Sequence, residues 1–315
     1  LLLAVVMVAL EVRHGFHRND LREGLITFHE WGLYSTALML AGIAMLVIHR
    51  RHALTSLSVA GQLTVLLAAC GCFIGQGVAV NPMWHSQFVG ETVLVNGLLD
   101  VYLLPALLLL LAAHLQQDRE TPTFPGVASL AGFAMLVLWS GLAVRQGFQG
   151  PFMNETEIGL REWGALTLAW LALSLLLMAA ARRWRLFTVA GAGRAILVLA
   201  ALQFQLGQGL AGNPVLTGDS IGATPVFNDL LIGYLAPTLL FAAIAWFCYQ
   251  RDRLWAGFAM VVAMAGGWLT LLLNTRQMFQ GSRLDAFFGA RTPSLAEWGA
   301  YGWVTLLYGQ GLLLA

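Results

Sequence analysis

The sequence predicts an all-α polytopic membrane protein with about ten transmembrane helices. Of its 315 residues, 58% are hydrophobic and only 10% are charged, and the mean hydropathy is +0.73. A soluble domain of this size carries about 25% charged residues. Apolar runs of spanning length recur along the whole chain. Because lipid offers no partner to backbone groups, such runs must form helices.

The charge and the cysteine content narrow the class of protein further. The net charge is +1, which gives no reason to expect a nucleic-acid partner. Cys70, Cys72 and Cys248 lie in apolar runs, so we interpret them as small packing residues and not as a disulfide framework. The composition predicts membrane lipids as partners, with other envelope proteins as a second class.

Polar motifs recur along the sequence at an interval of about 132 residues, and repetition at a fixed interval is typical of tandem structural units. An Arg-x-x-Phe motif and a Glu-Trp-Gly motif each occur three times, and other marks occur twice. The motifs begin at Arg13, Arg145 and Arg276 and at Glu30, Glu162 and Glu297, and the paired marks are Gln76 with Gln208, Asn81 with Asn213, Asn96 with Asn228, Tyr102 with Tyr234 and Pro105 with Pro237.

Each unit contains four apolar stretches that are long enough to cross a membrane as helices. An even number of spans returns the chain to its starting side, so the units share one orientation and are parallel repeats. The expected spans are 31–49, 53–75, 92–114 and 126–144, then 163–181, 186–207, 226–248 and 254–273, with partial stretches at 1–12 and 298–315. We expect one membrane domain within a longer chain, divided into the last helix of a preceding repeat (1–12), repeat one (13–144), repeat two (145–275) and the start of a third repeat (276–315).

The connecting segments predict which end of the helices faces the cytoplasm. Short basic segments at 49–52 and 182–185 link the first and second spans of each unit. Segments with Arg119, Arg251 and Arg253 link the third and fourth spans. Because short arginine-rich loops stay in the cytoplasm, we expect the recurring motifs to face the periplasm or exterior of a bacterial inner membrane.

Two interpretations fit the recurring Arg and Glu residues, which lie where one helix leaves the membrane and the next enters. They can form ion pairs, within a unit or between neighbours, that hold an interfacial loop with its aromatic residues among lipid headgroups. Alternatively, they line an outward cavity that binds a polar headgroup, a sugar or a phosphate. The candidates are Arg13, Arg145, Arg276, Glu30, Glu162, Glu297, Trp31 and Trp163.

The third span of the first unit carries a carboxylate, which indicates a functional site when it lies inside an apolar helix. Asn96 and Asp100 are four residues apart and are predicted to share one helical face. Pro105 is expected to kink this helix because it frees a backbone carbonyl. If Asp100 is only structural, it should pair with a nearby arginine, Arg13 or Arg145.

The second unit departs from the first at this place. Ile232 occupies the position of Asp100, and Asp229 directly follows Asn228. Asn228 and Asp229 are therefore the corresponding ligand-binding candidates of the second unit.

The sequence predicts no metal site and no cofactor. His14-x-x-His17 has the spacing of helical metal ligands, but glutamines replace both histidines in the other two units. The motifs of nucleophile elbows, zinc proteases and P-loops do not occur in the sequence. Whether the protein is an enzyme stays open, with Asp100, Glu91 and His85 as candidate acids or bases.

The most specific segments are "EVRHGFH" and "PVFNDLLIGYLAP". With the Glu-Trp-Gly motif, they resemble the large bacterial predicted membrane proteins catalogued as domain of unknown function twenty-three thirty-nine. The resemblance covers essentially the whole chain. It implies a long multi-pass membrane protein, often with a coiled-coil segment ahead of the membrane region, and it implies no reaction and no catalytic residue.

Three functional hypotheses follow. The first is a non-enzymatic envelope protein that binds or translocates an amphipathic molecule, a lipid or lipid-linked sugar, in an outward-facing groove. The second is a membrane-embedded transferase or hydrolase that acts on the periplasmic side. The third is a structural scaffold of the cell envelope. A carboxylate and a histidine about 3 Å from a common point would favour the enzyme, whereas a filled interior would favour the scaffold.

Overall fold

Helices make up almost all of the regular structure in the described part of the chain. The computed structural model describes residues 2–17, 26–93, 95–117, 123–154, 157–184, 187–222, 224, 227–284 and 292–314. Within these ranges, the only β-type pairing is an isolated bridge between Ser220 and Arg283. The all-α prediction is confirmed. Arg119 and Arg185, which the sequence places in connecting segments, lie outside the described residues.

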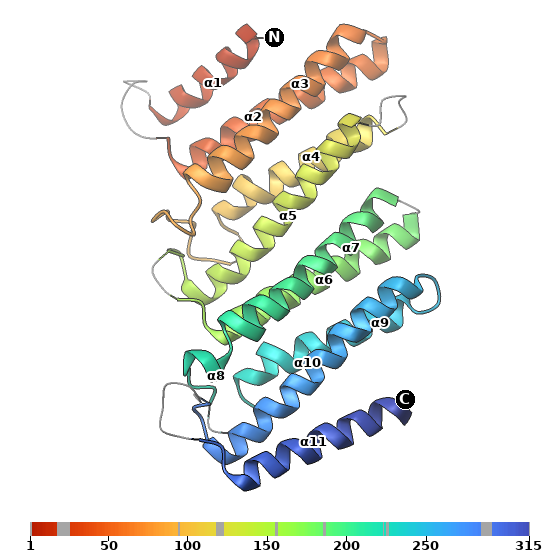
Figure 1. Ribbon diagram of the computed structural model, residues 1–315. Coiled ribbons are helices and arrows are strands. Elements are labelled where there is room, and N and C mark those ends of the chain that lie inside the picture. The colour runs from red at the N-terminus through yellow and green to blue at the C-terminus, as the bar shows by residue number, and fades with distance from the viewer. Residues whose placement is uncertain are drawn as a thin grey trace. The chain divides into compact units, whose positions relative to one another are not determined.

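By their internal contacts, the residues of the chain divide into two compact units, of which unit 1 is Leu1–Thr156. From here on, unit 1 and unit 2 mean these two parts, whose bounds differ from those of the expected repeats. In unit 1, α2 packs along α3 and α4 packs along α5 (Figure 1). The contact between α2 and α4 joins the two pairs, and α1 packs against α2. The elements are α1 (Leu2–Phe16), α2 (Phe28–His52), α3 (Thr55–Gly71), η1 (Cys72–Ala79), η2 (Leu99–Leu103), α4 (Leu104–Leu115) and α5 (Thr123–Gln149).

Unit 2 is Glu157–Ala315. Here α6 packs along α7, α9 packs along α10, and α6 contacts α9, while α11 packs against α10 (Figure 1). The elements are α6 (Leu160–Trp184), α7 (Phe187–Leu202), η3 (Gln203–Ala211), α8 (Pro214–Thr217), η4 (Leu231–Leu235), α9 (Ala236–Cys248), α10 (Arg253–Gln280) and α11 (Leu295–Leu314).

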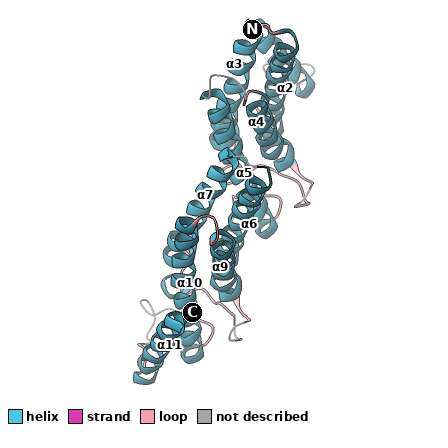
Figure 2. Cartoon of the chain, turned by 90° about the vertical axis from the view of Figure 1, so that its right-hand side faces the viewer, coloured by secondary structure: helices cyan, strands magenta, loops and turns pink. Residues whose placement is uncertain are grey.

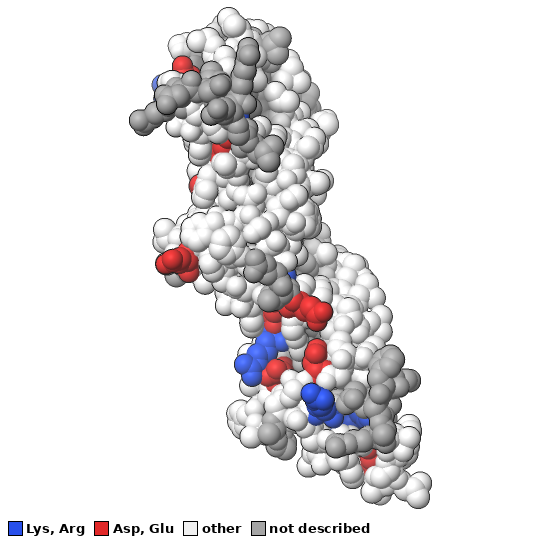
Figure 3. All heavy atoms as spheres, turned by 90° about the vertical axis from the view of Figure 1, so that its left-hand side faces the viewer, with Lys and Arg blue, Asp and Glu red and all other residues white. Residues whose placement is uncertain are grey.

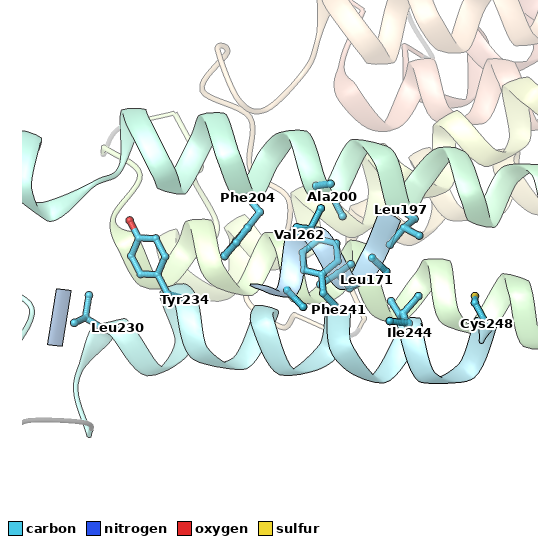
Figure 4. Close-up of a cluster of buried hydrophobic side chains, with 14 of the residues drawn as sticks. Leu171, Leu197, Ala200, Phe204, Leu230, Tyr234, Phe241, Ile244, Cys248 and Val262 are labelled. Carbon is cyan, nitrogen blue, oxygen red and sulfur yellow. The ribbon is translucent and has the colours of Figure 1, made fainter. Parts of the chain in front are cut away.

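The core of unit 2 lies between these helices and is filled by aliphatic and aromatic side chains (Figure 4). The Phe204 ring lies 6.1 Å from the Tyr234 ring and 5.7 Å from the Phe241 ring, measured between centroids. All three side chains are almost fully buried. Aromatic pairs at such separations add to the free energy gained from apolar burial, so this cluster holds η3, η4 and α9 together.

Seven helices of the described residues are long and apolar enough to cross a membrane. They correspond to seven of the ten expected spans. The expected span 92–114 is shorter in the structure, where the apolar helix covers Leu99–Leu115. The chain at Asn96 is irregular because the Asn96 side chain bonds to nearby backbone groups. The terminal helices α1 and α11 are also not among the seven.

In both units, the second and third spans contain π-helical segments at corresponding places: η1 and η2 in unit 1, η3 and η4 in unit 2. Pro105 and Pro237 each follow the shorter segment. The N–H of Leu104 bonds to the carbonyl of Leu99, and the N–H of Ala236 bonds to that of Leu231. This i→i−5 register continues the helix up to a proline ring, which lacks an N–H.

Candidate functional site

Two of the recurring arginines form buried ion pairs with recurring glutamates. Nη1 of Arg13 lies 2.9 Å from Oε1 of Glu30, and Nη1 of Arg276 lies 2.9 Å from Oε1 of Glu297. Both glutamate side chains are fully buried. Each pair joins the end of one helix to the first turn of the next within a single unit, which is the geometry that the ion-pair interpretation predicts.

A helix cap places each of these glutamates. Thr27 caps α2: its hydroxyl accepts from the N–H of Glu30, and the Glu30 carboxylate accepts from the N–H of Thr27. At α11, the Ser294 hydroxyl accepts from the N–H of Glu297 at 3.1 Å. A Thr or Ser three residues before a Glu is the sequence pattern of a capping box, so the local sequence fixes where the carboxylate lies.

Further donors complete the two glutamate sites in the same way. The Tyr34 hydroxyl donates to Glu30 at 3.0 Å, and the Tyr301 hydroxyl donates to Glu297 at 2.6 Å. His17 Nε2 lies 3.3 Å from Glu30 Oε2. At the corresponding place, the Gln280 amide donates to Glu297 at 2.7 Å. Histidine and glutamine can replace each other here because both provide an N–H donor.

His14 and His17 have the spacing of helical metal ligands, but His17 bonds to the carboxylate of Glu30. Among the described residues, no group of three or more His, Cys, Asp or Glu side chains is arranged to hold a metal ion.

The arginines also hold the loops that follow them. Nε of Arg145 donates to the carbonyl of Met153 at 2.7 Å, and Nε of Arg276 donates to the carbonyl of Leu284 at 2.8 Å. Arg145 belongs to unit 1 and its expected partner Glu162 belongs to unit 2, and both are buried.

Asn96 and Asn228 stabilise the loops that precede the third spans. The Asn96 amide donates to Gln146 at 2.6 Å, and Gln146 in turn donates to the carbonyl of Gly90 at 2.7 Å. Asn228 bonds to Gln277 in the same way, and Gln277 donates to the carbonyl of Gly222 at 2.9 Å. Gly90 and Gly222 both have positive φ angles, +111° and +95°, which favour glycine.

Gln76 and Gln208 are fully buried and tie three helices together in each unit. In unit 1, the Gln76 amide donates to the Ser35 hydroxyl at 3.0 Å, and the Tyr102 hydroxyl donates to the Gln76 carbonyl at 2.6 Å. In unit 2, the Thr167 hydroxyl donates to Oε1 of Gln208 at 2.9 Å, and Tyr234 donates to the Gln208 carbonyl. Both glutamines lie in π-helical segments, whose altered register leaves such carbonyls available.

Trp31 and Trp163 pack inside their units. A β-carbon at Gly75 would lie 2.5 Å from Cε3 of Trp31, and one at Gly212 would lie 2.6 Å from Cδ1 of Trp163. These glycines allow the indole rings, which are partly buried, to lie against the second span. Their expected position among lipid headgroups stays a prediction. Trp298, with 61% of its surface exposed, is more accessible.

Asp100 has a different partner from the one expected, because its Oδ2 lies 3.1 Å from Nδ1 of His29. The expectation of an Arg13 or Arg145 partner is wrong. Asn96 does not share a helical face with Asp100, because it precedes the helix. The side chains of His29 and Asp100 are 46% and 54% exposed, which makes this pair accessible to solvent or to a ligand.

Unit 2 has a corresponding pair. Nε of Arg161 lies 2.6 Å from Oδ1 of Asp229, with exposed fractions of 60% and 20%. In the register of the recurring motifs, Arg161 takes the position of His29, and Asp229 takes that of Gly97. The carboxylate of unit 2 therefore lies about one helical turn earlier in its span than Asp100 does in unit 1. It still bonds to a residue at the start of the first span. In unit 2, acidic and basic side chains lie beside one another at the end of the helices that carries its motifs (Figure 3).

The model of a family described as predicted membrane protein (DUF2339) matches residues 1–203. The chain belongs to the DUF2339 family. This DUF2339 protein is accordingly a multi-pass membrane protein of unknown function. No curated protein and no solved structure matches the chain.

In this DUF2339 protein, recurrence in the sequence identified the polar residues but not their partners. Glu91 and His85, the other acid or base candidates, lie on exposed segments, and no hydrogen bond of the described residues joins either side chain to Asp100. The sequence did not predict four of the hydrogen-bond partners, which are Ser35, Thr167, Tyr34 and Tyr301. A signal for Tyr34 and Tyr301 was present, since each lies four residues after a recurring glutamate and hence on the same helical face.

Proposed function

We propose that this DUF2339 protein is a non-enzymatic protein of the bacterial inner membrane that binds or moves an amphipathic envelope molecule, a lipid or a lipid-linked sugar. The binding surface is the end of each unit that carries the recurring motifs. The observation that carries this proposal is the accessible ion pair at that end of each unit, His29–Asp100 in unit 1 and Arg161–Asp229 in unit 2.

Accessibility separates these pairs from the other polar candidates. Glu30 and Glu297 have no exposed side-chain surface and are saturated by donors from their own unit. A ligand can reach Asp100, by contrast, without breaking the fold. A cation beside a carboxylate offers both donors and acceptors to a phosphate or to sugar hydroxyls.

An exposed apolar residue precedes each accessible carboxylate. Val95 is 77% exposed and Phe227 is 78% exposed. The two residues take the same position relative to the recurring motifs, in the loop before the third span. Apolar side chains beside charged groups at a membrane surface suit a molecule with a polar head and an acyl chain.

The proposal includes tandem repeats in one orientation, with the motif end facing the periplasm. The corresponding contacts of Gln76 and Gln208, of Asn96 and Asn228, and of the π-helical segments support the repeat. The basic segments at the opposite end support the orientation.

A membrane-embedded hydrolase or transferase is the second candidate, because a histidine lies 3.1 Å from a carboxylate in unit 1. In such an enzyme, Asp100 would orient His29 as a general base. The residues of unit 2 argue against an enzyme. Arg161 occupies the position of His29, and an arginine side chain cannot act as a general base. What the two units share is a carboxylate bonded to a nitrogen donor, and not an imidazole that can transfer a proton, which favours binding.

Lipid analysis of the protein in its native membrane tests the proposal. We would extract wild-type protein and the Asp100→Asn, Asp229→Asn double variant into polymer nanodiscs and identify the retained lipids by mass spectrometry. The matched control is Arg51→Gln, an exposed residue at the other end of unit 1. We expect one lipid or lipid-linked sugar to be enriched in the wild type and the control and lost from the double variant. Enrichment that persists in the double variant would overturn the proposed site, and no enrichment in any sample would favour the scaffold.

A further inference from the structure

A cavity lies in unit 2, at the end opposite the recurring motifs. It has a volume of about 400 Å³, which is within the range of small-ligand sites. The cavity lies where α6 ends and where α9 turns into α10, and Figure 2 views the structure from this end. It is lined by Arg182, Trp246, Phe247, Tyr249, Gln250 and Arg251. We propose that this cavity binds a phosphate group, either of an anionic phospholipid or of free phosphate.

The charge of the cavity favours an anion. Its described lining includes two guanidinium groups and no carboxylate. The nearest acid along the chain, Asp252, is bonded to Arg194. In the described part of the chain, no salt bridge involves Arg182 or Arg251. Both guanidinium groups can therefore direct their N–H groups to a ligand.

An aromatic ring holds the first of these guanidinium groups in place. Cζ of Arg182 lies 3.4 Å from the centroid of the Phe247 ring. Stacking of this kind occupies the face of the guanidinium plane and leaves the N–H groups at its edge available. A guanidinium edge matches the spacing of two phosphate oxygens, so Arg182 can bind a phosphate through two parallel hydrogen bonds.

Two exposed aromatic side chains line the cavity, as expected for a site at the boundary between lipid and water. Trp246 is 83% exposed and Tyr249 is 65% exposed, and both line the cavity. Such aromatic residues are enriched at the level of lipid headgroups. A phospholipid whose phosphate lies between the two arginines would have its glycerol and acyl carbons beside these rings. Basic cavities between transmembrane helices commonly bind anionic headgroups in this way.

Unit 1 provides a matched control. Arg50 takes the position of Arg182 in the register of the motifs, but Leu115 takes that of Phe247 and Gln117 that of Tyr249. The arginine recurs without the aromatic ring that would orient it. The proposed site is therefore specific to unit 2, and Arg50→Gln removes the corresponding charge outside the cavity.

Native mass spectrometry of the purified full-length chain in detergent tests the proposal. The probes are phosphatidylglycerol, phosphatidylcholine as the zwitterionic comparison, and inorganic phosphate. We expect phosphatidylglycerol to bind the wild type and Arg50→Gln equally, and to bind the Arg182→Gln, Arg251→Gln double variant at least tenfold more weakly. If free phosphate alone is the ligand, it should bind with the same dependence on the variants, while phosphatidylglycerol binds all variants alike.

If the double variant does not fold, a second variant, Phe247→Leu, tests the same site. Phe247→Leu retains both charges and installs the residue found in unit 1, and it should weaken binding of the preferred probe about threefold. Thermal unfolding of each variant confirms that it is folded. The proposal is overturned if neither probe binds the folded wild type, if the double variant and wild type bind both probes equally, or if phosphatidylcholine loses affinity in the double variant as much as phosphatidylglycerol does.

Discussion

Nη1 of Arg276 lies 2.9 Å from Oε1 of Glu297, and the pair joins the C-terminal part of α10 to the first turn of α11. Arg13 and Glu30 join α1 to α2 at the same distance. A loop whose two ends are fixed by a buried ion pair keeps the adjoining helices in register. These two pairs thus stabilise the fold, and the proposed ligand-binding role belongs to the exposed pairs beside them.

Removal of one partner of the buried pair should be costly. We expect Glu297→Gln to lower the free energy of unfolding by about 3 kcal/mol, because it leaves the Arg276 charge buried without its carboxylate. The combined Arg276→Gln, Glu297→Gln variant should lose less than the sum of the two single losses. Reversible unfolding in mixed micelles measures all four states of this cycle, and strictly additive losses would show that the pair contributes nothing.

His17 should be replaceable by glutamine. Gln280 makes the corresponding bond in unit 2, so we expect His17→Gln to change stability by less than about 0.5 kcal/mol. His17→Leu removes the donor and should cost about 1 kcal/mol. The same unfolding assay compares the two. Equal losses from both substitutions would mean that the imidazole does more than donate a hydrogen bond.

The buried glutamine of unit 2 should be a main polar contributor to stability. Gln208→Leu leaves the Gly233 carbonyl without its partner and leaves the Thr167 hydroxyl only the Trp163 carbonyl, and should cost about 2 kcal/mol. The control is Gln205→Leu, in the same π-helical segment but exposed, which should change stability little. Similar values for the two variants would contradict the importance of this network.

The two accessible ion pairs should be interchangeable. A β-carbon at Gly97 would clash with the His29 ring, so Gly97→Asp alone should destabilise unit 1. Adding His29→Arg and Asp100→Ile recreates the unit 2 pair and should restore stability. Thermal unfolding of the single and triple variants measures the recovery, and a triple variant no more stable than Gly97→Asp would refute the equivalence of the pairs.

The sequence predicted those features that depend on composition or on local spacing. Hydropathy located the seven helices that are long enough to cross a membrane. Recurrence selected Glu30 and Glu297, because a residue repeated in each unit serves the fold of that unit.

Features that depend on contacts between distant segments could not be predicted. Gln76 and Tyr102 lie on different helices, and nothing in their local sequence indicates that they touch. Asp100 was assigned the wrong partner because spacing along one helix does not show which helix lies beside it. The π-helical register depends on a few displaced hydrogen bonds, which leave no hydrophobic period to detect.

Cysteine labelling tests the central claim, that the two units have the same orientation with their motif ends outward. In a background without the native cysteines, His85→Cys and Asp219→Cys report on the motif ends of units 1 and 2, and Arg51→Cys and Arg183→Cys report on the opposite ends. All four positions are exposed. We predict that a membrane-impermeant maleimide labels positions 85 and 219 in intact cells and labels 51 and 183 only after permeabilisation. Labelling of 85 and 219 from opposite sides, or of both only from the cell interior, would contradict the account.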